Sequence, residues 1–290
     1  MNQSSDQVLN SWIQGEELAE AMVPMIGSLY RERDIVVSIY GRPLVRQSST
    51  NIVKAHRYAR QVIDRELPIA ESYAVLSAIA TRPLDSARVD LGKLTTGFAQ
   101  DGNGRSIDEY LDEVLAPISS GSGRLLSEPT DVVLYGFGRI GRLLARILIE
   151  RTGSGEKLRL RGIVLRPGDA GDAEKRASLL RRDSVHGPFT GTIKADSEKS
   201  QIIANGNAIQ LIYAKSPREV DYTAYGIDNA IVVDNTGIWR DEEGLGQHLA
   251  AKGVKRVLLT APGKGAIKNI IYGVNDGEIT ESDRALSAAS

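Results

Sequence analysis

The stretch Asp131-Val-Val-Leu-Tyr-Gly-Phe-Gly-Arg-Ile-Gly-Arg142 decides the fold class, because a β-rich apolar run leads directly into a glycine pattern and then into an amphipathic helix. The pattern is Gly136-x-Gly138-x-x-Gly141. Its first glycine permits a sharp strand-to-helix turn, its second lets backbone amides approach a pyrophosphate, and its third lets the helix pack close to the strand. Apolar residues continue at helical spacing behind it, at Ile140, Leu143, Leu144, Ile147 and Leu148. This context predicts a dinucleotide-binding turn.

Strands and helices are expected to alternate around this turn, as βαβ units require. Expected strands cover 131–135, 159–165, 190–193, 201–204, 208–212, 230–234 and 256–259. Expected helices cover 140–151, 174–181 and 242–252, and the chain then passes through Thr260-Ala-Pro262 to an apolar segment at 270–274. Asn205-Gly206 is a strong hairpin signal, so the strands at 190–193, 201–204 and 208–212 are expected to be antiparallel. The pattern predicts an α/β fold, a doubly wound Rossmann domain with a mostly parallel sheet and a hairpin insertion.

The residues before the turn indicate a mainly helical N-terminal extension. Apolar spacing predicts helices over 8–30, 52–67, 69–79 and 107–115, whereas the β-branched run at 35–40 leaves its state open. The Gly/Ser-rich segment Ser119-Ser-Gly-Ser-Gly-Arg124 is typical of a flexible linker. We therefore expect an extension at 1–119, a linker at 120–129 and an NAD(P)-binding domain at 130–290.

The charge balance offers no general attraction for polyanions. The chain has 290 residues and a formal net charge of -1, so we expect neither nucleic acid nor an anionic membrane as a partner. No apolar run reaches the roughly 18 residues that a membrane helix needs, and a cytoplasmic location is expected. Four basic residues share one expected helix: Lys54, Arg57, Arg60 and Arg65. They could face an acidic partner or nucleic acid, but interspersed acidic residues in the neighbouring helices favour a solvated face.

Five motifs follow one another in the order seen in glyceraldehyde-3-phosphate dehydrogenases. They are Gly136-Phe-Gly-Arg-Ile-Gly-Arg142, Asp183-Ser-Val-His-Gly187, Thr236-Gly237, Arg256-Val-Leu-Leu-Thr-Ala-Pro262 and Gly273-Val-Asn275. The chain resembles that family from about Asp131 to Ser290, and its extension is similar to that of the long bacterial members. The resemblance implies a doubly wound cofactor domain, a separate catalytic domain and a homotetramer. It also implies oxidation of a sugar-phosphate aldehyde with inorganic phosphate and NAD(P) to an acyl phosphate.

The chemistry that the resemblance implies needs a cysteine, and the 290 residues contain none. In the family a Ser-Asn-Ala-Ser-like run precedes the nucleophilic cysteine, and Ser287-Ala-Ala-Ser290 stands at that place. The implied thiolate attacks the aldehyde, and the implied histidine base follows the cysteine in sequence. His186 and His248 therefore do not replace it, and His186 is expected to form structural hydrogen bonds.

We accordingly assign no catalytic residue and no metal ligand within this chain. The chain alone is expected to bind cofactor without turning over substrate, and the native chain is expected to continue past Ser290. One alternative is a non-catalytic NADP-binding or regulatory module that acts through its helical extension. Another alternative, within enzymes, is an erythrose-4-phosphate dehydrogenase.

The choice of cofactor depends on the end of the second expected strand. There a carboxylate usually accepts hydrogen bonds from the adenosine ribose, which favours NAD. Aligning Gly162-Ile-Val-Leu-Arg-Pro167 with the family places Arg166 at that position. Because a guanidinium pairs with phosphate in a bidentate manner, Arg166 favours NADP over NAD, or dual use. In the alternative, Arg166 points to solvent, and Asp169 or Asp172 serves the ribose.

The remaining candidate contacts are carried over from the family position by position. The backbone amides of Arg139 and Ile140 face the pyrophosphate, and Phe137 forms a wall of the pocket. Thr236 and Gly237 resemble a Thr-Gly pair beside the adenosine portion. Thr260 matches a serine on the nicotinamide side, where its hydroxyl could bond the carboxamide or only stabilise a turn. Two residues depart from the family pattern: Tyr135 replaces a usual asparagine, and Lys215 replaces a usual arginine near adenine.

Overall fold

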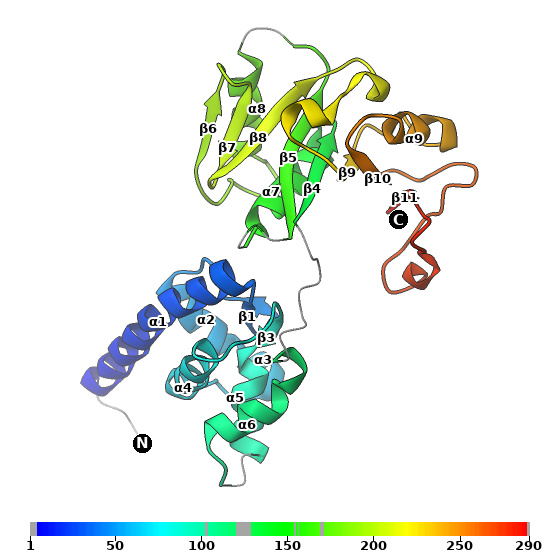
Figure 1. Cartoon of the computed structure of the whole chain (residues 1–290). Coiled ribbons are helices and arrows are strands. Elements are labelled where there is room, and N and C mark those ends of the chain that lie inside the picture. The colour runs from blue at the N-terminus through cyan, green and yellow to red at the C-terminus, as the bar shows by residue number, and fades with distance from the viewer. Residues whose placement is uncertain are drawn as a thin grey trace. The chain divides into compact units, whose positions relative to one another are not determined.

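The chain forms two compact units, Met1–Ser127 and Glu128–Ser290, and each is described here by itself (Figure 1). The computed structural model describes residues 5–101, 104–119, 129–153, 155, 157–168 and 171–288. Of the linker expected at 120–129, only Pro129 belongs to the described residues.

The N-terminal unit is mainly helical, as expected, and contains a small sheet. Its helices are α1 (Ser5–Arg33), α2 (Ser49–Tyr58), α3 (Arg60–Ile63), α4 (Ile69–Ala80), α5 (Leu91–Asp101) and α6 (Ile107–Val114). Strands β1 (Val36–Ile39), β2 (Arg42–Pro43) and β3 (Arg88–Asp90) pair in the order β2-β1-β3. Buried side chains from the helices and from β1 form one hydrophobic core, in which Met22, Ile39, Leu76 and Leu91 are at most 1% exposed.

Helix α1 continues through Pro24, as the expected helix at 8–30 requires. Other elements of this unit differ from the sequence-based expectation. The helix expected at 52–67 is interrupted at Ala59, and its second piece ends at Asp64, whose φ of 56° is left-handed. The open segment at 35–40 forms strand β1, because Tyr40 and Gly41 both take positive φ and close a tight turn to β2. Helix α5 was not anticipated, since its threonines and Gly97 have low helix propensity and packing overrides that preference.

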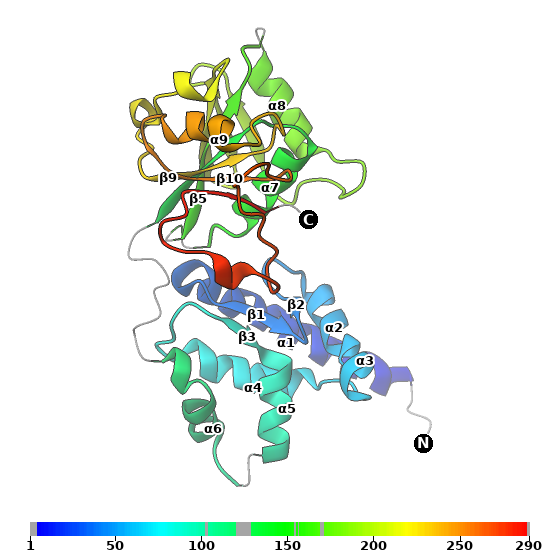
Figure 2. The ribbon, with the colours of Figure 1, turned by 90° about the vertical axis from the view of Figure 1, so that its right-hand side faces the viewer.

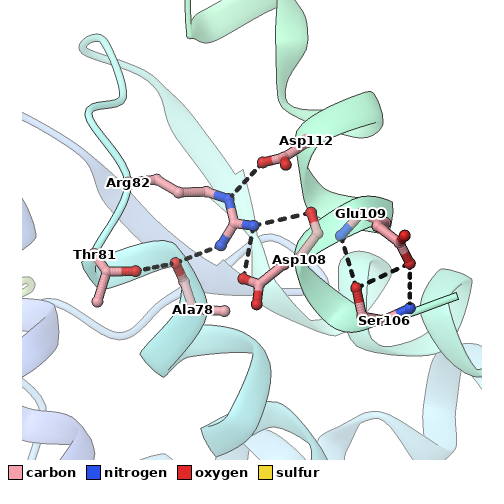
Figure 3. A network of polar contacts seen from close by, with 7 residues as sticks. All are labelled: Ala78, Thr81, Arg82, Ser106, Asp108, Glu109 and Asp112. Carbon is pink, nitrogen blue, oxygen red and sulfur yellow. Dashed lines mark hydrogen bonds and ion pairs between the residues drawn. The ribbon is translucent and has the colours of Figure 1, made fainter.

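Arg82 joins helix α4 to helix α6 (Figure 3). Its guanidinium donates to the Ala78 carbonyl, to Asp112 and to both the carbonyl and the carboxylate of Asp108, at 2.7–3.2 Å. The Arg82 side chain is only 12% exposed. In α6 itself, Ser106 and Glu109 form a reciprocal capping box. These bonds attach α6 to the rest of the unit.

We expect Arg82→Ala to lower the free energy of unfolding of the N-terminal unit by about 1–3 kcal/mol, because carbonyls lose a charged donor in a poorly hydrated place. Urea titration followed by circular dichroism measures the change. Arg60→Ala is the control, since Arg60 and Glu66 form an ion pair with side chains 62% and 52% exposed, and such pairs contribute about 0–1 kcal/mol. Equal decreases in the free energy of unfolding for the two variants would show that the Arg82 hydrogen bonds contribute no more than an exposed ion pair.

The C-terminal unit is a doubly wound α/β domain, which confirms the expected fold class. Its strands are β4 (Thr130–Tyr135), β5 (Leu158–Leu165), β6 (Ile193–Asp196), β7 (Gln201–Ala204), β8 (Asn207–Tyr213), β9 (Ala230–Asp234), β10 (Val254–Leu259) and β11 (Ala285–Ser287). Its helices are α7 (Arg139–Glu150), α8 (Asp172–Arg181) and α9 (Glu242–Leu249). The sheet order is β11-β10-β9-β4-β5-β8-β7-β6, parallel except at β6 and β7.

Two hydrophobic clusters cover the two faces of this sheet. Strand β4 shows the division, because Val132 and Leu134 pack with α7 and α8 while Val133 and Tyr135 pack on the side of α9. Figure 2 shows α7 and α8 apart from α9. Since β5 follows β4 on one side and β9 lies on its other side, the chain reverses its winding direction at β4. Open α/β sheets bind ligands at the carboxyl ends of the strands beside such a reversal.

The strand expected at 190–193 is misplaced, since β6 begins only at Ile193. Gly191 has a φ of 139°, and the Asn205 side chain accepts from the Thr192 amide and donates to the Thr190 carbonyl. These side-chain bonds occupy backbone groups of Thr190 and Thr192 that would pair with a neighbouring strand if this segment were itself a strand. The Asn205-Gly206 hairpin is confirmed, with Ala204 opposite Asn207.

The end of the chain also differs from expectation. The last strand is β11 rather than the apolar segment at 270–274, and helix α9 ends at Leu249. Strand β11 has only three residues, too few for a periodic pattern to reveal it.

Candidate nucleotide-binding site

Every candidate cofactor residue lies at the carboxyl ends of five neighbouring parallel strands. Along the sheet, Thr260 follows β10, Thr236 and Gly237 follow β9, the glycine turn at 136–141 follows β4, Arg166 follows β5, and Lys215 comes two residues after β8. Hydrogen bonds connect neighbouring ends, since the Asn235 amide donates to the Tyr135 carbonyl and the Gly136 amide donates to the Val164 carbonyl. The structure thus brings together residues that are up to 124 positions apart in sequence (260 minus 136).

The three glycines of the turn differ in what surrounds them. Gly136 has a φ of 92°, and a Cβ there would lie 2.9 Å from Cγ2 of Thr236. A Cβ at Gly141 would overlap the Gly136 carbonyl oxygen. A Cβ at Gly138 would meet no heavy atom of the described residues within 4 Å. The turn therefore leaves open space at the glycine where a bound anion would approach the backbone.

Helix α7 begins directly after this open glycine. Gly138 is its N-cap and provides no side-chain hydrogen bond, so the amides of the first turn have no partner within the helix. Arg139 and Ile140 are exposed, whereas Phe137 is 4% exposed and packs in the core beneath the turn. The unpaired amides and the helix dipole favour an anion here. Phe137 therefore packs beneath the turn, whereas the sequence predicted that it would form a wall of the pocket.

Arg166 and Asp172, two candidates for the adenosine ribose, lie in different surroundings near the ends of β5 and β8. Arg166 is exposed. Asp172, with a side chain 7% exposed, pairs with Arg176 at 3.1 Å and accepts from the Tyr213 hydroxyl at 3.2 Å. A Cβ at Gly168 would come within 2.9 Å of its carboxyl carbon. Asp172 is therefore held by its neighbours, and the other candidate acid, Asp169, lies outside the described residues.

Lys215 is exposed beyond the end of β8. Its backbone amide donates to the Glu219 carboxylate at 3.0 Å, which fixes the backbone and leaves the ammonium group on the surface. This position is compatible with the expected contact near adenine.

The sequence-based reasoning missed three residues at this edge of the sheet: Asp234 and Asn235 at the end of β9, and His248 in helix α9. Asp234 is fully buried, and its carboxylate accepts from the Thr236 amide, the Thr236 hydroxyl and Nε2 of His248. Asn235 accepts weakly from the Thr260 hydroxyl at 3.4 Å. The polar pair Asp234-Asn235, at the end of an apolar strand, was the signal in the sequence that could have pointed to these residues. The Thr260 hydroxyl also donates to the Asp234 carbonyl at 3.0 Å, which favours the turn-stabilising alternative for Thr260.

Tyr135 lies beneath this edge of the sheet. Its ring meets the His248 ring edge-on, with centroids 4.7 Å apart. Burial, and secondarily the nearby Asp234 carboxylate, raise the pKa of Tyr135 to about 12. The replacement of the family asparagine thus places a neutral phenol below the turn.

The raised pKa predicts a loss of stability at alkaline pH. The folded state favours the neutral phenol, so this contribution is complete below pH 10 and is lost as the pH rises towards 12. We expect the free energy of unfolding of the parent, measured by urea titration, to fall over this interval. Tyr135→Phe should make that fall shallower by up to ~1.4 kcal/mol per pH unit. Tyr272→Phe is the control, since Tyr272 is 93% exposed. Identical pH profiles for all three proteins would refute the assignment.

His186 forms local hydrogen bonds, as expected. Its Nδ1 lies 3.0 Å from Oδ1 of Asp183, which also accepts the amides of Val185 and His186. These bonds hold the pKa of Asp183 well below its usual range. The bonds of Asp183 thus form a local turn, and the Gly187 carbonyl at its end accepts from Arg146 of helix α7 at 2.8 Å.

Among the described residues, no group of three or more histidine, aspartate or glutamate side chains is arranged to hold a metal ion. Within the same ranges, no helix is both long and apolar enough to cross a membrane.

The doubly wound sheet, the glycine turn and the open helix N-terminus define a nucleotide-binding unit of the Rossmann class. The family described as "Glyceraldehyde 3-phosphate dehydrogenase, NAD binding domain" matches residues 130–242. The C-terminal unit therefore belongs, over these residues, to the NAD-binding domain family of glyceraldehyde-3-phosphate dehydrogenases.

Three relatives illustrate the similarity. A glyceraldehyde-3-phosphate dehydrogenase-like protein of Pseudomonas aeruginosa is 56% identical over 271 residues, which cover 93% of this chain and 59% of the relative. Glyceraldehyde-3-phosphate dehydrogenases of Zymomonas mobilis and Thermotoga maritima are 37% and 33% identical, each over 55% of this chain and 44% of their own length. The chain thus spans about half the length of these relatives. The Pseudomonas match is too long to lie within the 163 residues of the second unit (290 minus 127), so it includes the N-terminal unit.

Proposed function

We propose that this chain is the NAD(P)-binding part of a phosphorylating aldehyde dehydrogenase. In the complete protein, an aldehyde and inorganic phosphate would be converted to an acyl phosphate while NAD(P)+ is reduced through a cysteine thioester. The observation that supports cofactor binding is the meeting of the open glycine turn with Thr236, Arg166 and Lys215 at one edge of the sheet. The family membership supports the reaction.

The chain's own residues would bind and orient the cofactor. The first-turn amides of α7, behind Gly138, would receive the pyrophosphate. Thr236 and Gly237 would border it on the β9 side, and Thr260 would hold the turn beyond β10. The bound cofactor would supply hydride transfer. We propose a sugar-phosphate aldehyde as substrate and a homotetramer as assembly for the complete protein, with a cytoplasmic location.

We further propose that NADP is preferred over NAD. Arg166 is exposed at the position where a carboxylate would favour NAD. Asp172, the alternative acid, is already engaged by Arg176 and Tyr213. Releasing it to a ribose would leave the Arg176 guanidinium and the Tyr213 hydroxyl without that partner. This arrangement favours the phosphate of NADP at Arg166.

The chain alone is proposed to be inactive, because it contains no cysteine and the proposed chemistry needs a thiolate. The test has two parts. Isothermal titration with NADP+ and NAD+ measures binding, and absorbance at the reduced-nicotinamide band measures turnover of glyceraldehyde 3-phosphate with phosphate. Binding without turnover is expected. Failure to bind either nucleotide would refute the cofactor site, and turnover would refute the requirement for cysteine.

The absence of cysteine also favours one second candidate, a non-catalytic NADP-binding or regulatory module. The intact mass of the protein in its native source distinguishes the two. A mass near 31.4 kDa would favour the module. A substantially larger mass would favour the dehydrogenase.

A further inference from the structure

A buried acid and a buried imidazole lie directly beneath the β9 and β10 ends of the candidate site. The Asp234 and His248 side chains are both 0% exposed, and Nε2 of His248 lies 2.9 Å from Oδ2 of Asp234. A buried carboxylate is stable only when donors surround it. Three donors do so here, since the other carboxylate oxygen accepts from the Thr236 amide at 2.6 Å and the Thr236 hydroxyl at 2.7 Å.

Asp234 contacts both neighbouring turns through different atoms. Its carboxylate fixes Thr236 after β9. Its backbone carbonyl accepts from the amide and from the hydroxyl of Thr260, both at 3.0 Å, after β10. Removing the carboxylate's charge would therefore weaken the bonds to Thr236 directly and leave the backbone bonds to Thr260 in place.

Thr236 in turn packs against the glycine turn. Its Cγ2 lies 2.9 Å from the place that a Cβ of Gly136 would take, and its hydroxyl accepts from the Ile238 amide at 3.1 Å. The first glycine of the pattern thus has no room for a side chain because Asp234 holds Thr236 there. The spacing between the β4 turn and the β9 turn, between which a dinucleotide would lie, depends on this contact.

His248 closes the arrangement from helix α9. Its Nδ1 is buried and has no hydrogen-bond partner among the described residues, which fits the tautomer that carries the proton on Nε2 and donates it to Asp234. The Tyr135 ring meets the imidazole edge-on and limits its rotation. The imidazole therefore fixes which way the Asp234 carboxylate turns.

We propose that Asp234 is a positioning residue of the cofactor site and that His248 is the residue that orients it. Together they hold Thr236 against the glycine turn, so that the two turns are already spaced for a dinucleotide before it arrives. This inference rests on the proposed cofactor binding. Pre-organisation of this kind improves affinity because less ordering remains to be done on binding.

The test compares four variants of the full chain by isothermal titration with NADP+. Asp234→Asn keeps the shape but removes the charge, and His248→Leu removes the donor; we expect each to weaken binding about tenfold, the loss of roughly one hydrogen bond to a charged group. His248→Gln retains an amide donor and should bind within about threefold of the parent. Asp131→Asn is the matched control, because Asp131 is also a buried strand carboxylate, paired with Arg159 at 2.8 Å, but at the opposite end of β4.

A spectroscopic measurement separates positioning from general destabilisation. The backbone amide signal of Thr236 in ¹H–¹⁵N spectra should move in Asp234→Asn and in His248→Leu, return towards the parent position in His248→Gln, and stay unchanged in Asp131→Asn. If the parent binds NADP+ and Asp234→Asn binds it equally well, the positioning role is wrong while the proposed function stands. Equal loss of affinity in Asp131→Asn, or no rescue by glutamine, also overturns it. If the parent binds neither NADP+ nor NAD+, the proposed function itself is wrong, and this inference with it.

Discussion

Gly138→Ala is expected to fold as stably as the parent and to bind NADP+ about 30-fold more weakly. The backbone of Gly138 is extended, with a φ of -71° and a ψ of -163°, which alanine adopts without strain. Within the part of the chain that the structure describes, the added methyl group would meet no atom within 4 Å. It would instead occupy the space through which a pyrophosphate approaches the amides. Losing one hydrogen bond to a charged group costs about 2 kcal/mol, which corresponds to this change in affinity.

Two further glycine variants make this result specific. Gly246→Ala in helix α9 also adds a methyl group where no atom of the described residues lies within 4 Å. It should lower neither the unfolding temperature nor the affinity for NADP+. Gly141→Ala forces a methyl group onto the Gly136 carbonyl oxygen, so it should lower both the unfolding temperature and the affinity. Thermal unfolding and isothermal titration give the two quantities. Undiminished NADP+ binding by Gly138→Ala would mean that no anion lies against this turn.

Arg166→Asp is expected to weaken NADP+ binding about 100-fold and to leave NAD+ binding equal or better. Hydrogen bonds from a guanidinium to a phosphate contribute about 1.5–3 kcal/mol each, and the new carboxylate would repel the 2′-phosphate while accepting bonds from a ribose. Titrating both nucleotides into both proteins gives the ratio of dissociation constants, which is the measure of preference.

Arg151→Asp is the control for net charge, because Arg151 is also exposed but follows the far end of helix α7. Both variants should be titrated at low and at physiological salt, since a general charge effect is screened by ions. Unchanged NADP+ affinity in Arg166→Asp would show that the alignment of β5 with the family strand is wrong. An equal loss in Arg151→Asp would show that only the overall charge matters.

Local sequence patterns predicted the elements with strong periodicity. Strand β4 and helix α7 deviate from their expected bounds by one residue, because apolar spacing and the glycine turn act within a short stretch. The prediction was wrong at 190–193, where the Asn205 side chain competes for the backbone. It missed α5 and β11, since packing against distant residues stabilises the first and parallel pairing with β10 the second.

The same difference between local patterns and contacts of distant residues applies to the candidate site. Residues within one motif, such as Gly136 and Gly141, were recognisable because their spacing carries the physical constraint. Asp172 illustrates the opposite case: the sequence left open whether it or Asp169 serves the ribose, and the partners of Asp172 come from α8 and β8. His248 was set aside as a catalytic base, and its buried bond to Asp234 could not be read from two positions 14 residues apart.

The doubly wound class, the glycine turn and the family resemblance could all be predicted from the sequence, because each depends on short-range patterns in the chain. Which side chains meet at the carboxyl edge of the sheet could be seen only in the folded chain. That outcome depends on the order and register of parallel strands, in which β9 returns beside β4 after more than 90 residues (230 minus 135). Hydrogen bonds such as those of Asp234 form only after this pairing is complete, so no local pattern records them.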